Sequence, residues 1–166
     1  MKARLALTTI LAFGALTFVA CDDDDEPTGG GNEPETFTAT LTGGAEVPPV
    51  TTDATGSAGF TVTRSTGTPV VTTVAYSATV TGLSGPATAA HIHGPADVNT
   101  AAGIIVPLSV TGTGTTGQII SGSFTTTGNP NVSVDSLVVL LRNGNSYINI
   151  HTAANVDGEI RGQIRP

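Results

Sequence analysis

The chain contains three histidines, and all of them fall in two short segments. His91 and His93 lie in the segment 89–94, and His151 lies near the end of the segment 147–152. A neutral imidazole is a common ligand for transition metals, and histidine is also the usual proton carrier near neutral pH. Residues 21–166 contain no lysine and no tryptophan, so few other groups could do chemistry. The pattern predicts a metal site at the three histidines.

Three imidazoles with no thiolate or acid beside them favour copper, with zinc as the second choice, and they leave a coordination position open. Tyr147 and Asn149 share a strand face with His151, so they are predicted to orient an imidazole through the ring nitrogen that does not bind metal. The alternative is that the histidines only pack or form hydrogen bonds, with His91 and His93 beside a turn and His151 at a separate strand end.

The segments that carry the histidines are predicted to be β-strands. In the segment 91–93 the side chains alternate, so Ile92 faces the core while the two imidazoles face outward, ~6–7 Å apart. The same alternation in the segment 147–151 turns its two isoleucines inward. The segment 159–163 is predicted to turn Glu159 and Arg161 outward as a surface pair. The metal site is therefore expected on the outer wall of the fold.

The rest of the chain predicts an all-β domain. Threonine, valine, glycine and serine dominate, and apolar and polar residues alternate in short runs such as 37–41 and 58–63. Glycine and proline turn signals separate these runs. The pattern favours an antiparallel Greek-key β-sandwich of about seven to eight strands.

One segment departs from this alternation. Ser133 and Asp135 are candidate N-terminal caps, three leucines follow at helical spacing, and Gly144 is placed to end the element. The segment predicts one short helix near residues 134–142. A buried strand is the alternative, because two β-branched valines lie in the same short run.

The first 35 residues are expected to serve export and attachment. Residues 1–20 have the pattern of a cleaved signal peptide, with a short basic start and an apolar stretch. The segment 16–21 resembles the lipobox of bacterial lipoproteins, which implies cleavage after Ala20 and lipid attachment to Cys21. An ordinary secretory signal with an incidental Cys21 is the alternative. Residues 21–35 then form an acidic, flexible tether, and residues 36–166 form one domain.

These features predict an extracytoplasmic protein that is held by its lipid at a bacterial membrane. The outer membrane or the cell surface is favoured over the inner membrane. The formal net charge is −7, and no cluster of basic residues exists, so nucleic acid is excluded as a partner. Cys21 is the only cysteine, so no disulfide can hold the domain together. The sequence indicates no particular protein partner.

The motifs of the globular part resemble those of the CHRD domain, a module first named in chordin that is also present in bacterial secreted proteins. The matching segments occur in the same order along nearly the whole domain: 37–43, 46–50, 54–56, 88–94, 103–106, 144–152 and 158–164. The resemblance implies a β-sandwich but attaches no catalytic activity to it.

A more distant likeness is to copper/zinc superoxide dismutase, a Greek-key sandwich with a His-x-His pair and a late copper-binding histidine. His91, His93 and His151 fall at comparable places in the order. The chain lacks the bridging histidine and the zinc ligands of that enzyme, and Arg161 does not align with its active-site arginine. The likeness therefore implies at most a three-histidine copper site.

Three classes of function follow. The first is a membrane-anchored module that binds copper outside the cytoplasm. The second is a structural or protein-interaction domain at the cell surface without a metal. The third is a redox enzyme with a mononuclear copper centre, which ranks last because no acid, base or radical partner is evident and no catalytic residue is assigned.

Overall fold

The computed structural model describes residues 33–166, so the predicted signal peptide, Cys21 and most of the acidic tether lie outside the described residues. The strands are β1 (Glu35–Thr42), β2 (Thr55–Arg64), β3 (Thr72–Thr81), β4 (Ala87–His93), β5 (Ile104–Leu108), β6 (Gly117–Phe124), β7 (Tyr147–Thr152) and β8 (Ile160–Gln163). The helices are the short 3-10 turn η1 (Gly43–Ala45) and α1 (Val134–Arg142). Within the described residues, no helix is long and apolar enough to cross a membrane.

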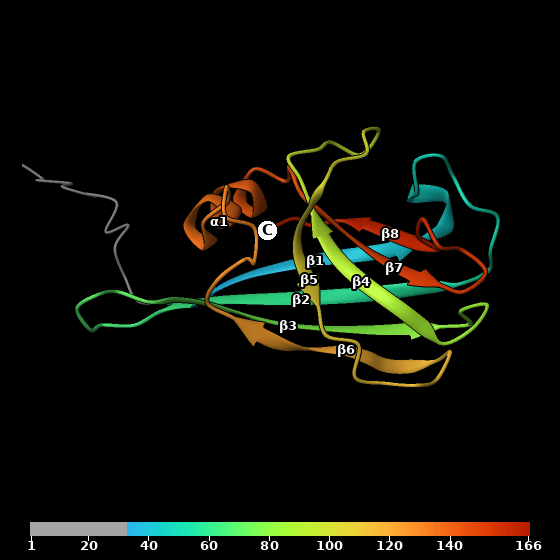
Figure 1. Ribbon diagram of the computed structural model, residues 1–166, viewed down its shortest axis with the longest axis horizontal. Helices are drawn as coiled ribbons and strands as arrows, with labels where there is room; N and C mark the ends of the chain where they lie inside the picture. The colour runs from blue at the N-terminus through green and yellow to red at the C-terminus, as the bar shows by residue number, and fades with distance from the viewer. Residues whose placement is uncertain (1–32) are drawn as a thin grey trace, which may run out of the picture. The chain divides into compact units, whose positions relative to one another are not determined.

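All eight strands belong to one sheet, with the order β5-β4-β7-β8-β1-β2-β3-β6 and antiparallel pairing throughout. The last strand, β8, returns to lie beside β1, and β1, β2 and β3 are consecutive neighbours. This is the Greek-key arrangement. The sheet folds over so that β4 and β5 cross in front of β1, β2 and β3 (Figure 1). The predicted all-β Greek-key sandwich is therefore confirmed.

A single apolar core fills the space between the two halves of the sheet. Every strand contributes to it, because alternate residues turn to the same side. Phe60 and Leu41 come from one half, Ile92 and Ile148 from the other, and all four are at most 2% exposed. Burial of such side chains stabilises a fold by about 1.5–3 kcal/mol each. The core therefore accounts for the stability of a domain that has no disulfide.

The helix α1 lies where the sequence predicts it, and the alternative of a buried strand is wrong. The Ser133 side chain caps the helix by accepting a hydrogen bond from the backbone N–H of Ser136. Leu137 and Leu141 lie fully in the core. Asp135 is not the cap, since it accepts a hydrogen bond from the Thr72 hydroxyl at 2.8 Å.

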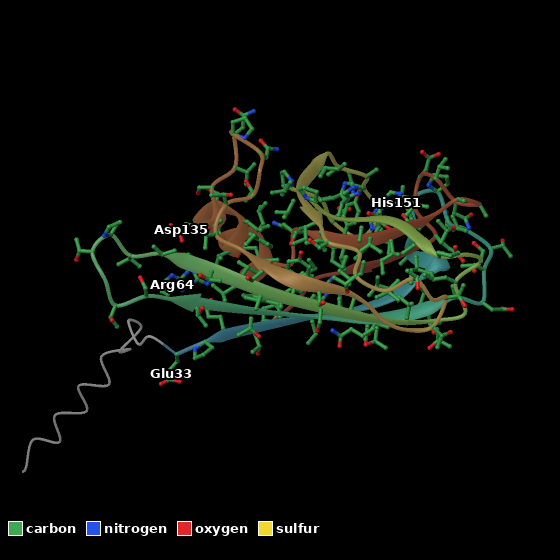
Figure 2. The ribbon with its side chains drawn as sticks, turned by 60° about the horizontal axis from the view of Figure 1, so that its bottom comes forward. Glu33, Arg64, Asp135 and His151 are labelled. Atoms are coloured by element: carbon green, nitrogen blue, oxygen red, sulfur yellow. The ribbon has the colours of Figure 1, made fainter. Side chains whose placement is uncertain are left out.

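The helix and the histidines lie toward opposite ends of the sheet. Arg64 and Asp135 lie near the end where α1 packs, whereas His151 lies toward the other end (Figure 2). At the helix end, Glu35 on β1 pairs with Arg64 of β2 and with Arg142 of α1, both at 2.6 Å. These ion pairs lower the pKa of Glu35 to about 2, with the Arg142 hydrogen bond as the largest cause. Ion pairs therefore connect β1, β2 and α1 at this end of the sheet.

The three imidazoles lie on the outer wall of the sandwich, as strand alternation predicts, but a loop covers part of this wall. The imidazoles do face away from Ile92, but the connection between β4 and β5, residues 94–103, covers that face. Arg161 donates hydrogen bonds to the carbonyl oxygens of Asp97 and Thr100, at 2.9 and 3.0 Å. Gln163 donates to the Ala96 carbonyl oxygen at 2.7 Å. Long polar side chains of β8 thus hold the connection down over the sheet.

The prediction that Glu159 and Arg161 form a pair on the surface is wrong. Glu159 is fully buried and Arg161 is 2% exposed. Neither belongs to a salt bridge within residues 33–166. Glu159 lies just before β8, and its carboxylate accepts hydrogen bonds from hydroxyl groups, whereas Arg161 binds backbone carbonyls. Strand alternation placed both side chains on one face, but it could not show that loops cover that face.

Candidate metal centre

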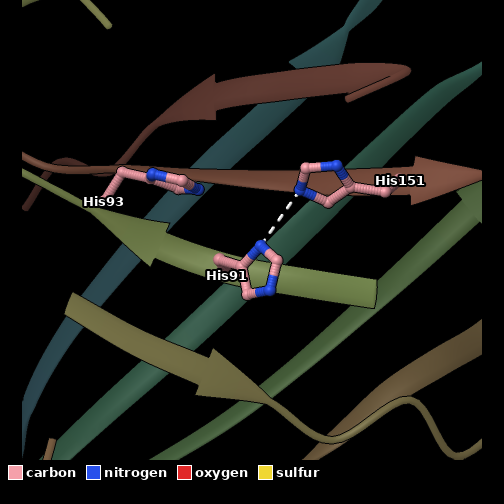
Figure 3. A group of neighbouring side chains, drawn as sticks. All are labelled: His91, His93 and His151. Carbon is pink, nitrogen blue, oxygen red and sulfur yellow. Dashed lines mark hydrogen bonds between the residues drawn. The ribbon is translucent and has the colours of Figure 1, made fainter. Parts of the chain in front are cut away.

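Two neighbouring strands bring the three histidines together. In the pairing of β4 with β7, His91 lies opposite Asn149, and His93 lies opposite Tyr147. His151 lies opposite Ala89, one step along the same face. Because residues two apart on a strand share a face, the three imidazoles gather on one side of the sheet (Figure 3).

The ring nitrogens lie within the range of a shared ion. His91 Nδ1 and His151 Nε2 are 3.0 Å apart. One ligand nitrogen from each of the three rings can be chosen so that all lie within 4.8 Å of one another. The described residues therefore contain a group of three histidines that could hold a metal, as their spacing in the sequence predicts.

Backbone carbonyl groups fix which nitrogen of two rings carries the hydrogen. His93 Nδ1 lies 2.9 Å from the Ala102 carbonyl oxygen, and His151 Nδ1 lies 2.9 Å from the Val156 carbonyl oxygen. A carbonyl oxygen only accepts hydrogen bonds, so each Nδ1 must be the donor. In the neutral rings, each Nε2 then carries a lone pair. Metal-binding histidines commonly show this arrangement, in which the second nitrogen donates to a fixed acceptor.

Burial favours the neutral form of two imidazoles of the site, those of His91 and His93. Burial, together with the nearby His151 and His93 rings, lowers the pKa of His91 to about 4. Burial also lowers the pKa of His93, which is 8% exposed, despite its hydrogen bonds to Ala102 and Asn149. Neutral imidazole is the form that binds metal ions. His93 is already neutral at neutral pH, so no proton has to leave its Nε2 when a metal binds.

The structure places Asn149 and Tyr147 against the histidines, on the strand face that they share with His151. Asn149 Oδ1 lies 3.0 Å from Nε2 of His93 and 3.0 Å from Nε2 of His151. These are the nitrogens with free lone pairs, and the other nitrogen of each ring, Nδ1, is fixed by a backbone group. The two backbone groups are the carbonyl groups of Ala102 and Val156.

Tyr147 fixes His93 by stacking. The two rings are nearly parallel, with an interplanar angle of 1° and centroids 4.7 Å apart. The Arg161 guanidinium lies 3.5 Å from the centroid of the Tyr147 ring, in a cation–π contact. The Tyr147 hydroxyl also accepts a hydrogen bond from the backbone N–H of Ala102, at 3.2 Å. The Tyr147 side chain thereby contacts both His93 and Ala102, the residue whose carbonyl oxygen accepts the His93 hydrogen bond.

Sequence reasoning missed Glu46, the one acidic side chain beside Asn149. It follows η1 and is 7% exposed, and burial raises its pKa to about 7, although Arg161 and the Asn149 amide act in the opposite direction. Its Oε1 atom is buried without a hydrogen-bond partner in the described part of the chain. The segment 46–50 reads as a proline-fixed turn. A single acid among apolar residues was the only available signal.

The fold and the site define a class of protein: an antiparallel β-sandwich module with a three-histidine cluster on one covered face. The family model of the CHRD domain matches residues 37–164, so the chain belongs to the CHRD domain family. Among curated proteins and solved structures, none matches the chain.

Proposed function

We propose that this CHRD domain binds copper through His91, His93 and His151. The observation that carries the proposal is the pair of Nδ1–H groups, on His93 and His151, that donate to backbone carbonyl oxygens. They leave two Nε2 lone pairs beside the third imidazole, with every ring partly or fully buried. A set of neutral nitrogen donors of this kind is suited to a transition metal.

The types of donor favour copper over zinc. The three candidate ligands are imidazole nitrogens, and residues 33–166 contain no thiolate. The 3.0 Å between His91 Nδ1 and His151 Nε2 is a hydrogen-bond distance, and it is also compatible with two ligands of one ion. Tetragonal nitrogen and oxygen sites are typical of copper(II), and copper also binds most tightly in the series of divalent metals.

The proposed location is the outer side of a bacterial membrane. It is supported by the sequence of residues 1–21, in which a basic start and an apolar stretch precede Cys21. A lipid on Cys21 would tether the domain, with the outer membrane or cell surface favoured. A lipid-tethered copper-binding domain there would sequester or deliver the metal outside the cytoplasm.

The proposal is tested by copper(II) titration of the full chain against a competing chelator. Every protein carries Cys21→Ser, because a free thiol is itself a copper ligand. We expect one copper per chain, with nitrogen couplings in the electron paramagnetic resonance spectrum, and an affinity loss of more than about 10-fold in His91→Ala. Gln118→Ala, which removes an exposed polar side chain on β6, is the control and should bind as the parent does.

Equal and weak binding by the parent and His91→Ala would reject the site, because the acidic residues 22–26 could cause such binding without the histidines. The chain would then be a CHRD module without a metal, as in the structural or interaction alternative. Binding without any turnover of an oxidant by the copper-loaded protein would separate the binding module from the redox enzyme.

A further inference from the structure

The side chain of Asn149 lies between the imidazoles and Glu46. On one side, Oδ1 is 3.0 Å from both His93 Nε2 and His151 Nε2. On the other side, Nδ2 and Glu46 Oε1 lie near the same point, because a Cβ atom at Gly158 would come within 2.8 Å of Nδ2 and collide with Oε1. Asn149 is 3% exposed, so water has little access to this arrangement.

The orientation of the Asn149 amide brings three acceptors together. His93 Nε2 and His151 Nε2 carry lone pairs, since both Nδ1 hydrogens donate to carbonyl oxygens. Asn149 Oδ1 is an acceptor as well. His91 Nδ1–H can donate to His151 Nε2, at 3.0 Å, but the contact of Asn149 Oδ1 with His93 Nε2 joins two acceptors, which repel each other unless a cation lies beside them. In a metal-free site, rotation of the amide by 180° would instead let Nδ2 donate to the two rings.

Glu46 supplies a reason for the observed orientation. Its Oε1 atom is buried and has no hydrogen-bond partner among residues 33–166, so it needs a nearby donor. The Asn149 amide is the side-chain donor group beside it, since Nδ2 and Oε1 both lie within 2.8 Å of the position of a Cβ atom on residue 158. A carboxylate favours the N–H side of an amide, and this preference turns Oδ1 toward the histidines.

We propose that Asn149 Oδ1 is a fourth ligand of the metal and that Glu46 is the positioning residue that aims it. This inference rests on the proposed copper site. It gives Asn149 a direct contact with the ion, where sequence reasoning assigned a supporting role, and it gives Glu46 a function that its sequence context does not suggest.

Three of the distances are compatible with a square arrangement of ligands. His91 Nδ1, His151 Nε2, Asn149 Oδ1 and His93 Nε2 follow one another at three successive separations of 3.0 Å. Corners of a square with such sides lie about 2.1 Å from its centre, which is a usual metal–nitrogen bond length. A tetragonal site with three nitrogens and one oxygen is typical of copper(II). His91 and His151 are partly exposed, so a metal ion could enter the cluster from their side.

The direct test is nuclear magnetic resonance of the full chain, labelled with ¹³C and ¹⁵N and carrying Cys21→Ser. The probe is zinc(II), a diamagnetic ion that the same donors accept. We expect zinc to shift the side-chain carbonyl carbon of Asn149 more than that of any other asparagine. Asn155 is the internal control, because its side chain lies on the adjacent turn and donates to Ser84 instead of to the histidines.

The second test compares copper affinity among variants. Asn149→Ala is expected to weaken copper binding about 10- to 100-fold, while Asn155→Ala changes it less than about 2-fold. Glu46→Gln should weaken it by a smaller factor, about 3- to 10-fold, because a neutral amide can present either a donor or an acceptor to Asn149. Asp157→Asn, on the neighbouring turn, is its matched control and should bind as the parent does.

The outcomes separate the two claims. If the histidine variants lose copper while Asn149→Ala keeps it and the Asn149 carbonyl signal stays in place, the fourth ligand is refuted and the copper site stands. If the parent protein binds no copper, both claims fail. Thermal unfolding of each variant identifies any loss that comes from misfolding, and the resonance test needs no variant of Asn149.

Discussion

Glu46 and Glu159 are both buried carboxylates, yet their surroundings differ completely. Glu159 is fully buried and accepts hydrogen bonds from the Thr52 hydroxyl, the Ser84 backbone N–H and hydroxyl, and the Thr152 hydroxyl. Burial alone would raise its pKa, but these donors outweigh it and hold the pKa below its usual value. Within residues 33–166 no group donates a hydrogen bond to Glu46 Oε1, the Asn149 amide and the Val47 N–H oppose burial only in part, and burial raises the pKa of Glu46 to about 7.

The comparison shows that donors, and not depth, decide what a buried acid does. Glu159 ties residues from three separate parts of the chain together and acts as an anchor of the fold. Glu46 is left unsatisfied next to Asn149, where it costs stability and is available to the metal centre. Gly158 immediately precedes Glu159 in the sequence and provides the space that Glu46 and Asn149 occupy.

The largest effect should come from Glu159→Gln, which replaces an acceptor of four hydrogen bonds with a group that is half donor. We expect the free energy of unfolding at pH 7 to fall by about 2–4 kcal/mol, measured by urea denaturation. Since the folded pKa of Glu159 lies below the unfolded value of 4.5, the parent also loses stability as the pH falls below about 4.5. Glu33→Gln, at an exposed site, should change stability by less than about 0.5 kcal/mol. An equal loss in both variants would contradict the anchoring role.

Gly158→Ala should have the next largest effect. Gly158 has φ of +125°, and a Cβ atom there would collide with Glu46 Oε1. We expect a loss of about 2 kcal/mol in the free energy of unfolding, together with weaker copper binding, because Asn149 must move. Gly59→Ala is the control, since a Cβ atom on Gly59 meets no other atom within 4 Å. Unchanged copper affinity in a folded Gly158→Ala protein would separate this turn from the metal centre.

The smallest effect, of opposite sign, is expected for Glu46→Gln. The folded pKa of about 7 exceeds the unfolded value of 4.5, so the folded protein binds the extra proton between these values. The parent therefore loses stability as the pH rises from about 4.5 through 7. Removal of the charge should raise the free energy of unfolding by about 1–2 kcal/mol at pH 8 and should have little effect at pH 4. Urea denaturation at both pH values measures this difference, and a destabilised variant at pH 8 would show that Glu46 has a donor after all.

Local sequence patterns were enough to predict the strands, the helix and the face of each histidine. Strand alternation places His91 and His93 on the face opposite to Ile92. The leucines after Ser133 are spaced so that a helix buries them on one side. Both patterns depend on neighbours within a few residues. They carry over to the folded state because the core needs an apolar face from every element.

The environment of the site could not be predicted in the same way. Whether Arg161 is a surface residue or a buried one depends on carbonyl groups more than 60 positions away in the chain. The segment 46–50 gives no sign that Glu46 will meet Asn149. These contacts come from loops, and a loop has no repeating pattern that would reveal which face of the sheet it covers.

By itself, the sequence determined that the chain folds as a Greek-key sandwich and that its histidines share one face, because side-chain alternation is a local property of strands. Only the tertiary structure decided that this face is covered, that the Ala102 and Val156 carbonyl groups fix the imidazole nitrogens, and that Glu46 lies unsatisfied beside Asn149. The reason is physical. Hydrogen bonding and desolvation depend on which distant groups meet, and that is settled by the packing of the loops over the sheet.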